Sequence, residues 1–175
     1  MITMKIIALS CIAFLVAFAT KVSAAGSSAQ CSVTIVPGIA ANKNTQTTTG
    51  GDLTFGTIIP GSSSGTVTIN PSTSTRNSSG GVQLVDSISG PAAFDVTGAA
   101  NSSYTVTLPT NGTTTISSGN STMAVNSFSA SPTPGSSTLD SQGVSTFKVG
   151  GRLEVPANQP SGNYTGTFDV TVAYQ

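Results

Sequence analysis

The sequence of 175 residues contains no histidine and no tryptophan, and only 7% of its residues are charged. Ordinary soluble domains carry about 25% charged residues, so this surface must be built from Ser, Thr, Asn and Gly. The absence of imidazole excludes a Ser-His nucleophile pair and a histidine-ligated zinc or copper site. The GSSSG stretch at residues 61–65 therefore matches the G-x-S-x-G pattern of hydrolases by coincidence, because no histidine can activate the serine.

Long apolar runs are also absent, apart from one near the N-terminus. Residues 1–5 carry one positive charge, residues 6–19 are almost wholly apolar, and residues 22–24 supply the small side chains that signal peptidase requires. The apolar run is shorter than the roughly 20 residues of a membrane-spanning helix. We therefore expect residues 1–24 to be a cleaved export signal that leaves no membrane anchor. The mature protein is then expected in the periplasm and afterwards at the cell surface or outside the cell.

Basic residues are few in the expected mature chain. Cleavage after residue 24 leaves 151 residues, which is enough for one domain. Two of the six basic residues lie in the signal, so four remain against six acidic residues, a net charge of −2. Without a basic patch, nucleic acid is not an expected partner.

Cysteine is nearly absent as well. Cys31 is the single cysteine of the expected mature chain, which excludes an intramolecular disulfide. It alternates with Val33 and Ile35, so we predict a small hydrophobic side chain on the apolar face of a strand. A disulfide between two molecules stays open as the alternative.

The acidic residues are scattered and form no calcium loop of the D-x-D-x-D-G type. Two carboxylates could converge as a glycosidase pair, which a sequence cannot reveal. The candidates for such a hydrolase, a remote alternative, are Asp86, Asp95, Asp140 and Glu154. We expect instead a protein that is not an enzyme, with no catalytic residue, no metal site and no cofactor.

Short alternating segments, bounded by Gly, Pro, Asn or Ser, recur along the mature chain. Their spacing and their content of Val, Thr, Ile, Phe and Tyr predict an all-β protein. The segments are Ala29–Val36, Asp52–Ile59, Thr66–Ile69, Val82–Val85, Phe94–Val96, Tyr104–Leu108, Met123–Phe128, Val144–Val149, Arg152–Val155 and Tyr164–Tyr174. We expect one antiparallel β-sandwich, immunoglobulin-like or pilin-like, over residues 52–175. Asn111 and Gly112, between Leu108 and Ile116, predict a tight hairpin turn.

Residues 25–51 lie outside the predicted sandwich. They begin with a strand-like segment whose apolar positions are Ala29, Cys31, Val33 and Ile35. Residues 37–51 (PGIAANKNTQTTTGG) contain almost no large apolar residue, which predicts a flexible connection. Alternation does not say which sheet a strand joins, so the N-terminal strand either completes its own sandwich or reaches a neighbouring molecule.

The last residues, SGNYTGTFDVTVAYQ (161–175), show the most regular alternation in the chain. One face holds Gly162, Tyr164, Gly166, Phe168, Val170, Val172 and Tyr174. The other face consists of Asn, Thr and Asp up to position 171. This pattern predicts one long strand with a single buried face.

Several motifs between residue 52 and the C-terminus, in this order, resemble a family of secreted bacterial proteins catalogued as a domain of unknown function. They are DLTFGTI at 52–58, GGVQL at 80–84, AFDVTGAAN at 93–101, VGGRL at 149–153 and PANQPSGNYTGTF at 156–168. The family has no established biochemical activity. The resemblance therefore implies a fold and export, and no particular function.

The C-terminus also resembles the last strand of chaperone-usher pilus subunits and of spore-coat-U-type secreted subunits. As in those subunits, a glycine (Gly162) stands fourteenth from the end and a tyrosine (Tyr174) is penultimate. The resemblance implies an incomplete sandwich with a groove beside its last strand. A periplasmic chaperone would fill the groove first, and the N-terminal arm of the next subunit would replace it at an outer-membrane usher. The chain departs from many pilus subunits in lacking an internal disulfide.

These features predict an exported structural subunit of a surface fibre, which assembles with identical or related subunits by β-strand donation. The predicted donor arm runs from Ala29 to Ile35, and the predicted assembly strand runs from Gly162 to Tyr174. A self-contained adhesin or carbohydrate-binding sandwich is the alternative. It is weakened because most aromatic residues fall on strand faces that a core would bury.

Overall fold

The structure, a computed structural model, describes residues 32–133 and 137–175. The chain divides into two units, residues 1–34 and residues 35–175, and the fold described below is that of the second unit. The expected export signal at residues 1–24 lies outside the described residues. No helix in the described part of the chain is long and apolar enough to cross a lipid bilayer.

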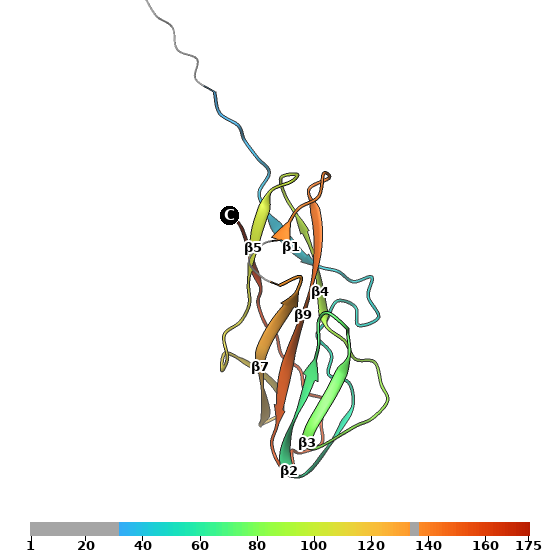
Figure 1. The fold of residues 1–175 in the computed structure, drawn as a ribbon. Helices are drawn as coiled ribbons and strands as arrows, with labels where there is room; N and C mark the ends of the chain where they lie inside the picture. The colour runs from blue at the N-terminus through green and yellow to red at the C-terminus, as the bar shows by residue number, and fades with distance from the viewer. Residues whose placement is uncertain (1–31, 134–136) are drawn as a thin grey trace, which may run out of the picture. The chain divides into compact units, whose positions relative to one another are not determined.

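The described residues of the second unit form strands, turns and loops (Figure 1). The strands are β1 (Ala40–Lys43), β2 (Ile58–Ile69), β3 (Arg76–Leu84), β4 (Ala92–Thr97), β5 (Ser103–Thr107), β6 (Thr114–Ser118), β7 (Ser121–Ser131), β8 (Ser137–Thr138), β9 (Val144–Val155) and β10 (Thr171–Tyr174). Every pairing between these strands is antiparallel. The predicted all-β antiparallel sandwich is therefore confirmed.

The long strand β9 is the centre of the larger sheet (Figure 1). Along one edge it pairs with β7, and along the other with β4 near its start and with β2 near its end. The alternation had predicted two strands, separated at Gly150 and Gly151. One continuous strand forms because β9 has neighbours on both sides. Gly150 lies so close to the carbonyl oxygen of Ile69 that a Cβ would collide with it.

Two apolar clusters lie beside this sheet. The first core lies between β4 and β9 on one side and the smaller sheet β10–β5–β8 on the other, and it includes Tyr104 and Phe147. The second core lies on β2, β3, β7 and β9 and includes Val125 and Leu153. Full burial of a large apolar side chain contributes about 1.5–3 kcal/mol, so both clusters hold the sheets together.

The tight hairpin predicted at Asn111 and Gly112 is wrong, because β5 and β6 belong to different sheets. This turn is bound to β7 instead. The side-chain oxygen of Asn111 accepts a hydrogen bond from the backbone N–H of Ser127 at 2.7 Å. The side-chain oxygen of Asn126 accepts one from the N–H of Gly112 at 2.9 Å. The turn therefore carries the chain from one sheet to the other.

In place of the flexible connection expected at residues 37–51, the structure has strand β1 and a hydrogen-bonded turn. β1 pairs with β4, and Ala41 packs against the first core. The side-chain nitrogen of Asn44 donates to a carboxylate oxygen of Asp95 at 3.0 Å. The compact unit consequently begins at Ile35. Small alanine side chains are sufficient to pack an edge strand, so the scarcity of large apolar residues did not indicate a flexible segment.

Candidate functional site

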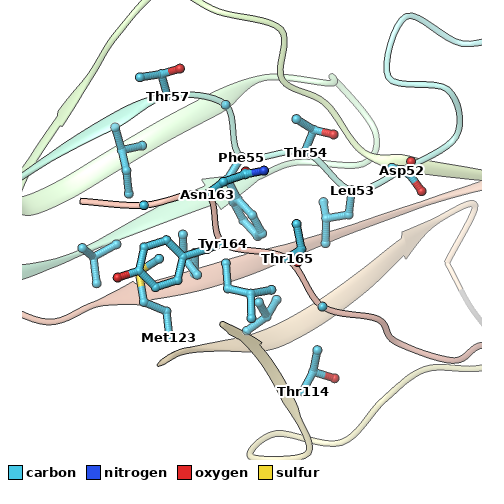
Figure 2. Close-up of a pocket in the computed structure, with 18 of the residues that line it drawn as sticks. Asp52, Leu53, Thr54, Phe55, Thr57, Thr114, Met123, Asn163, Tyr164 and Thr165 are labelled. Atoms are coloured by element: carbon cyan, nitrogen blue, oxygen red, sulfur yellow. The ribbon is translucent and has the colours of Figure 1, made fainter. Parts of the chain in front are cut away.

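A groove of about 1010 Å³ lies on the second core. It runs between two segments that lie mostly outside strands (Figure 2): residues 52–60, here called the first wall, and residues 159–168, here called the second wall. Lys43 and Phe168 line the near end of the groove, where Phe94 pairs with Lys43 and contacts the ring of Phe168. Pro60 and Gln159 line the far end, where the N–H of Asn158 donates to the carbonyl oxygen of Gly61.

The floor of the groove is apolar and comes from four strands. It consists of Ala92 and Phe94 of β4, Ile116 of β6, Met123 and Val125 of β7, and Leu153 and Val155 of β9. The floor residues from β7 and β9 are each at most 5% exposed, because wall residues such as Phe55 and Tyr164 pack against them. A segment bound in the groove would extend the second core. Apolar area removed from water in this way stabilises by about 25 cal/mol per Å².

The first wall has an unpaired edge. Thr54 exchanges two backbone hydrogen bonds of 2.9 Å with Gly90, so the backbone groups of Thr54 face away from the groove. In an extended segment the neighbouring residues present their backbone groups in the opposite direction, so Leu53 and Phe55 present theirs to the groove. The N–H and C=O of Leu53 and the N–H of Phe55 have no hydrogen-bond partner within residues 32–133 and 137–175.

Arg76 of β3 holds the first wall in place. Its Nη1 donates to the carbonyl oxygens of Phe55 at 3.0 Å and Thr57 at 3.4 Å, and its Nη2 donates to that of Val85 at 2.6 Å. Hydrogen bonds from a charged donor are stronger than neutral ones. The guanidinium thus joins the wall to the residue that follows β3.

The second wall has an unpaired edge too. Thr165 exchanges backbone hydrogen bonds of 2.8 Å and 3.0 Å with Ser117 of β6. Tyr164 and Gly166 therefore present their backbone groups to the groove, and these groups have no partner among the described residues. Gly166 permits the close approach to β6, because a Cβ would collide with the carbonyl oxygen of Thr115. Two free strand edges thus face each other across an apolar floor.

The two walls run in opposite directions. Thr54 is antiparallel to Gly90, which leads into β4, and Thr165 is antiparallel to β6. Both β4 and β7 run opposite to β9, and β6 runs opposite to β7. The first wall therefore runs in the direction of β9, and the second wall runs against it. A strand placed between them would be antiparallel to one wall and parallel to the other.

The predicted assembly strand at residues 162–174 is regular strand only in β10, which pairs with β5. The alternation is still visible in the burial of the side chains. Half-buried side chains are those of Tyr164, Phe168, Val170, Val172 and Tyr174, while Gly162 and Gly166 are exposed. Residues 166–170 form no strand, because none of the described segments pairs with them.

The predicted donor arm is described only in part. Ala29 and Cys31 lie outside the described residues. Val33 is 83% exposed and Ile35 is 89% exposed, and residues 32–36 form no strand. The strand predicted at the N-terminus is therefore not present over its described residues.

The carboxylates considered for a hydrolase make local contacts. Asp140 accepts two backbone hydrogen bonds within its own turn, Asp95 accepts hydrogen bonds from two neighbouring side chains, and Asp86 is exposed. Glu154 pairs with Arg152 at 2.7 Å. Within residues 32–133 and 137–175, no group of three His, Cys, Asp or Glu residues could hold a metal ion.

The sequence reasoning missed the first wall as part of a site. Residues 52–59 were predicted to form an ordinary strand, whereas β2 begins only at Ile58. Apolar and polar residues alternate in the same way in a strand with a neighbour and in a strand without one. The local sequence therefore does not predict which strand edge lacks a partner. The contacts of Arg76 were missed for a similar reason, because they join residues 9 and 21 positions apart.

Comparison with known proteins gives one assignment. None of the curated proteins compared with this chain matches it. A family model described as a domain of unknown function, DUF4402, matches residues 44–174. This range includes both walls and the whole floor of the groove. Since the match covers more than half of the chain, the protein belongs to the DUF4402 family.

Proposed function

We propose that the protein is an exported structural subunit of a surface fibre, and that each subunit receives a β-strand from another subunit in its groove. One observation carries the proposal. The groove joins an apolar floor to two strand edges whose backbone groups have no partner in the described part of the chain. The predicted export signal and the resemblance to pilus subunits support the same function.

The shape and chemistry of the groove favour an extended peptide. The ten residues of the second wall correspond to about 30 Å when fully extended, the length of a long strand. Strand addition gains affinity from main-chain hydrogen bonds along the edge and specificity from alternate side chains that enter pockets. Both contributions are available here, because the edges lie on either side of an apolar floor.

The arm of a second copy, residues 25–36, has the properties that such a groove requires. It contains no charged side chain, and its apolar residues alternate from Ala29 to Ile35. The two described apolar residues of that series, Val33 and Ile35, are exposed. Twelve extended residues span about 40 Å, which exceeds the length of the second wall.

A groove of this kind favours aggregation, because free strand edges pair with other chains. A subunit of this type therefore needs protection between export and assembly. A periplasmic chaperone that supplies a temporary strand, and an outer-membrane usher that exchanges it for the arm, would provide this protection.

A carbohydrate-binding function is less well supported. Sugar sites commonly use exposed aromatic rings, and the mature chain contains eight aromatic residues. Among the described residues, Tyr104 and Phe147 are buried, and the six other aromatic side chains are half-buried. No aromatic side chain in the described ranges is fully exposed, which weakens the case for a stacking platform there.

The test compares the mature protein (residues 25–175) with a chain that begins at residue 37. Unboiled samples on a denaturing gel are expected to show a ladder of polymers for the mature protein and one monomer band for the shorter chain. A mature protein that stays monomeric, soluble and thermally stable without a chaperone would overturn the proposal.

A matched pair of variants tests whether the apolar face of the arm is responsible. Val33→Asp combined with Ile35→Asp places two charges on the apolar face, and should remove the ladder because buried unpaired charges are costly. Ser32→Asp combined with Thr34→Asp places the same charges on the polar face, and should preserve the ladder. An equal loss of the ladder in both variants would show that the groove does not distinguish the apolar face of the arm from its polar face.

A further inference from the structure

The start of the second unit is bound to the penultimate residue of the chain. The hydroxyl of Tyr174 donates to the carbonyl oxygen of Pro37 at 2.8 Å and accepts from the backbone N–H of Ala99 at 2.6 Å. These three residues are called the clamp below. Tyr174 lies on β10, where it pairs directly with Tyr104 of β5. The clamp therefore attaches the residue that follows the arm to a buried part of the sandwich.

Strand β9 shows how far the clamp lies from the groove. Val144, at the start of β9, pairs with Thr97, which in turn pairs with Ala40. Lys43 and Phe94, which line the near end of the groove, pair with each other, and Phe94 pairs with Phe147 of β9. Phe147 is three steps from Val144, and Ala99 of the clamp lies two residues beyond Thr97, so five steps, or about 17 Å, separate the clamp from the near end. Pro37 precedes Ala40 in the chain, so the clamp lies at or beyond the Val144 end of β9.

This distance prevents the arm from filling the groove of its own chain effectively. An arm that turned back at Pro37 would use about five residues to cover about 17 Å before it entered the near end. Residues 32–36 would then lie outside the groove, and residues 25–31 (AGSSAQC) would lie inside it. Val33 and Ile35, the largest side chains of the alternating series, would be excluded from the apolar floor.

A second copy has no such restriction at the far end of the groove. Suppose that the donor subunit lies beyond Pro60 and Gln159. Its residue 36 then lies at the far end of the groove, and its residues 30–36 occupy the groove from that end. The donated strand would then run antiparallel to the second wall and parallel to the first. Val33 and Ile35 would both reach the floor, and each subunit would still present a free arm and a free groove at opposite ends.

Building on the proposed function, we infer that the clamp directs assembly: it holds Pro37 away from the groove, so that the groove is filled by a second copy in an open head-to-tail chain. Such a heterologous contact does not close on itself and extends without limit. Tyr174 is a positioning residue, because its hydroxyl fixes the place of Pro37. Loss of the clamp would free residues 37–39, which are about 10 Å of additional chain, and would allow Val33 to reach the groove of its own molecule.

The first test compares Tyr174→Phe with Tyr104→Phe in the mature protein. Tyr104 is the matched control, because it is the ladder partner of Tyr174 and its hydroxyl bonds Ser145 at 2.9 Å without contact to the arm. Size-exclusion chromatography with light scattering should show about a five-fold rise in the ratio of monomer to polymer for Tyr174→Phe, since one hydrogen bond of about 1 kcal/mol changes an equilibrium constant about five-fold. Tyr104→Phe should match the wild type.

A second variant leaves the clamp and the sandwich intact. Insertion of six Gly and Ser residues between Val36 and Pro37 adds about 20 Å of reach, so the arm can fill its own groove. We expect this insertion to convert polymers into monomers that unfold at a higher temperature than the chain that begins at residue 37. Unchanged polymers in both Tyr174→Phe and the insertion variant, or closed dimers in the wild type, would overturn the inference while leaving strand donation intact. A wild type without polymers would overturn the proposed function itself.

Discussion

At the scale of single residues, the side chain of Arg76 supplies hydrogen bonds to backbone carbonyl groups that a neighbouring strand would supply in a sheet. Its guanidinium donates to three carbonyl oxygens, two on the first wall and one on the residue that follows β3. The planar group has several donors in fixed directions, which a lysine ammonium does not reproduce. Arg76 makes no ion pair within the described residues, so its structural role is to hold the wall at the edge of the groove.

Arg76→Lys is therefore expected to lower the free energy of unfolding by about 1–3 kcal/mol, because hydrogen bonds from charged groups contribute about 1.5–3 kcal/mol each. Urea denaturation of the chain that begins at residue 37 measures this change. Arg152→Lys is the control, since Arg152 is an exposed partner of Glu154 and such pairs contribute less than about 1 kcal/mol. Equal losses in the two variants would contradict the role given to Arg76.

At the scale of elements, the C-terminal segment combines a paired half with an unpaired half. Residues 171–174 form β10 and pair with β5, whereas within the described ranges only Thr165 of the second wall has a backbone-to-backbone partner, Ser117. The glycine at position 166 allows this single bridge, because the carbonyl oxygen of Thr115 occupies the space of a Cβ. The edge is thus held in place by a few contacts and remains available for another strand.

Gly166→Ala should separate the second wall from β6 and lower the free energy of unfolding by about 1–3 kcal/mol, the usual cost of an overpacked contact. Thermal unfolding measures the change. Gly38→Ala is the control, because no atom lies within 4 Å of the position of its Cβ, and it should alter stability by less than about 0.5 kcal/mol. A neutral Gly166→Ala variant would mean that the wall moves freely away from β6.

At the scale of the whole molecule, a strand that binds in the groove would stabilise the folded chain. The floor belongs to the second core, and both walls can pair with an added strand. A peptide that binds only the folded chain stabilises it in proportion to the logarithm of its concentration relative to Kd. The arm and the groove are therefore linked to folding as well as to assembly.

A synthetic peptide of residues 25–36 should raise the Tm of the chain that begins at residue 37. At a hundred times Kd the gain is about 2.7 kcal/mol, or about 5–10 °C for a chain of this size. Differential scanning calorimetry measures the shift. A control peptide in which each apolar residue is exchanged with the next polar residue presents the wrong face and should have no effect. An equal shift with both peptides would indicate nonspecific binding.

The sequence by itself determined the class of the fold and the buried face of most strands. Phe147, Val149, Leu153 and Val155 alternate along β9 and are buried, because alternation in a strand is a local property that a single segment expresses. The positions of Tyr164 and Phe168 on one face of the last segment were predictable for the same reason.

Only the tertiary structure decided which edges have neighbours. It placed β5 and β6 in different sheets, added β1 to the larger sheet, and left one edge of each wall without a partner among the described residues, beside the second core. Backbone N–H and C=O groups are alike in nearly every residue, so they carry no sequence signal for pairing. The contacts that position the groove, such as Thr165 with Ser117 and Tyr174 with Pro37, join residues 48 and 137 positions apart, and only the folded chain brings them together.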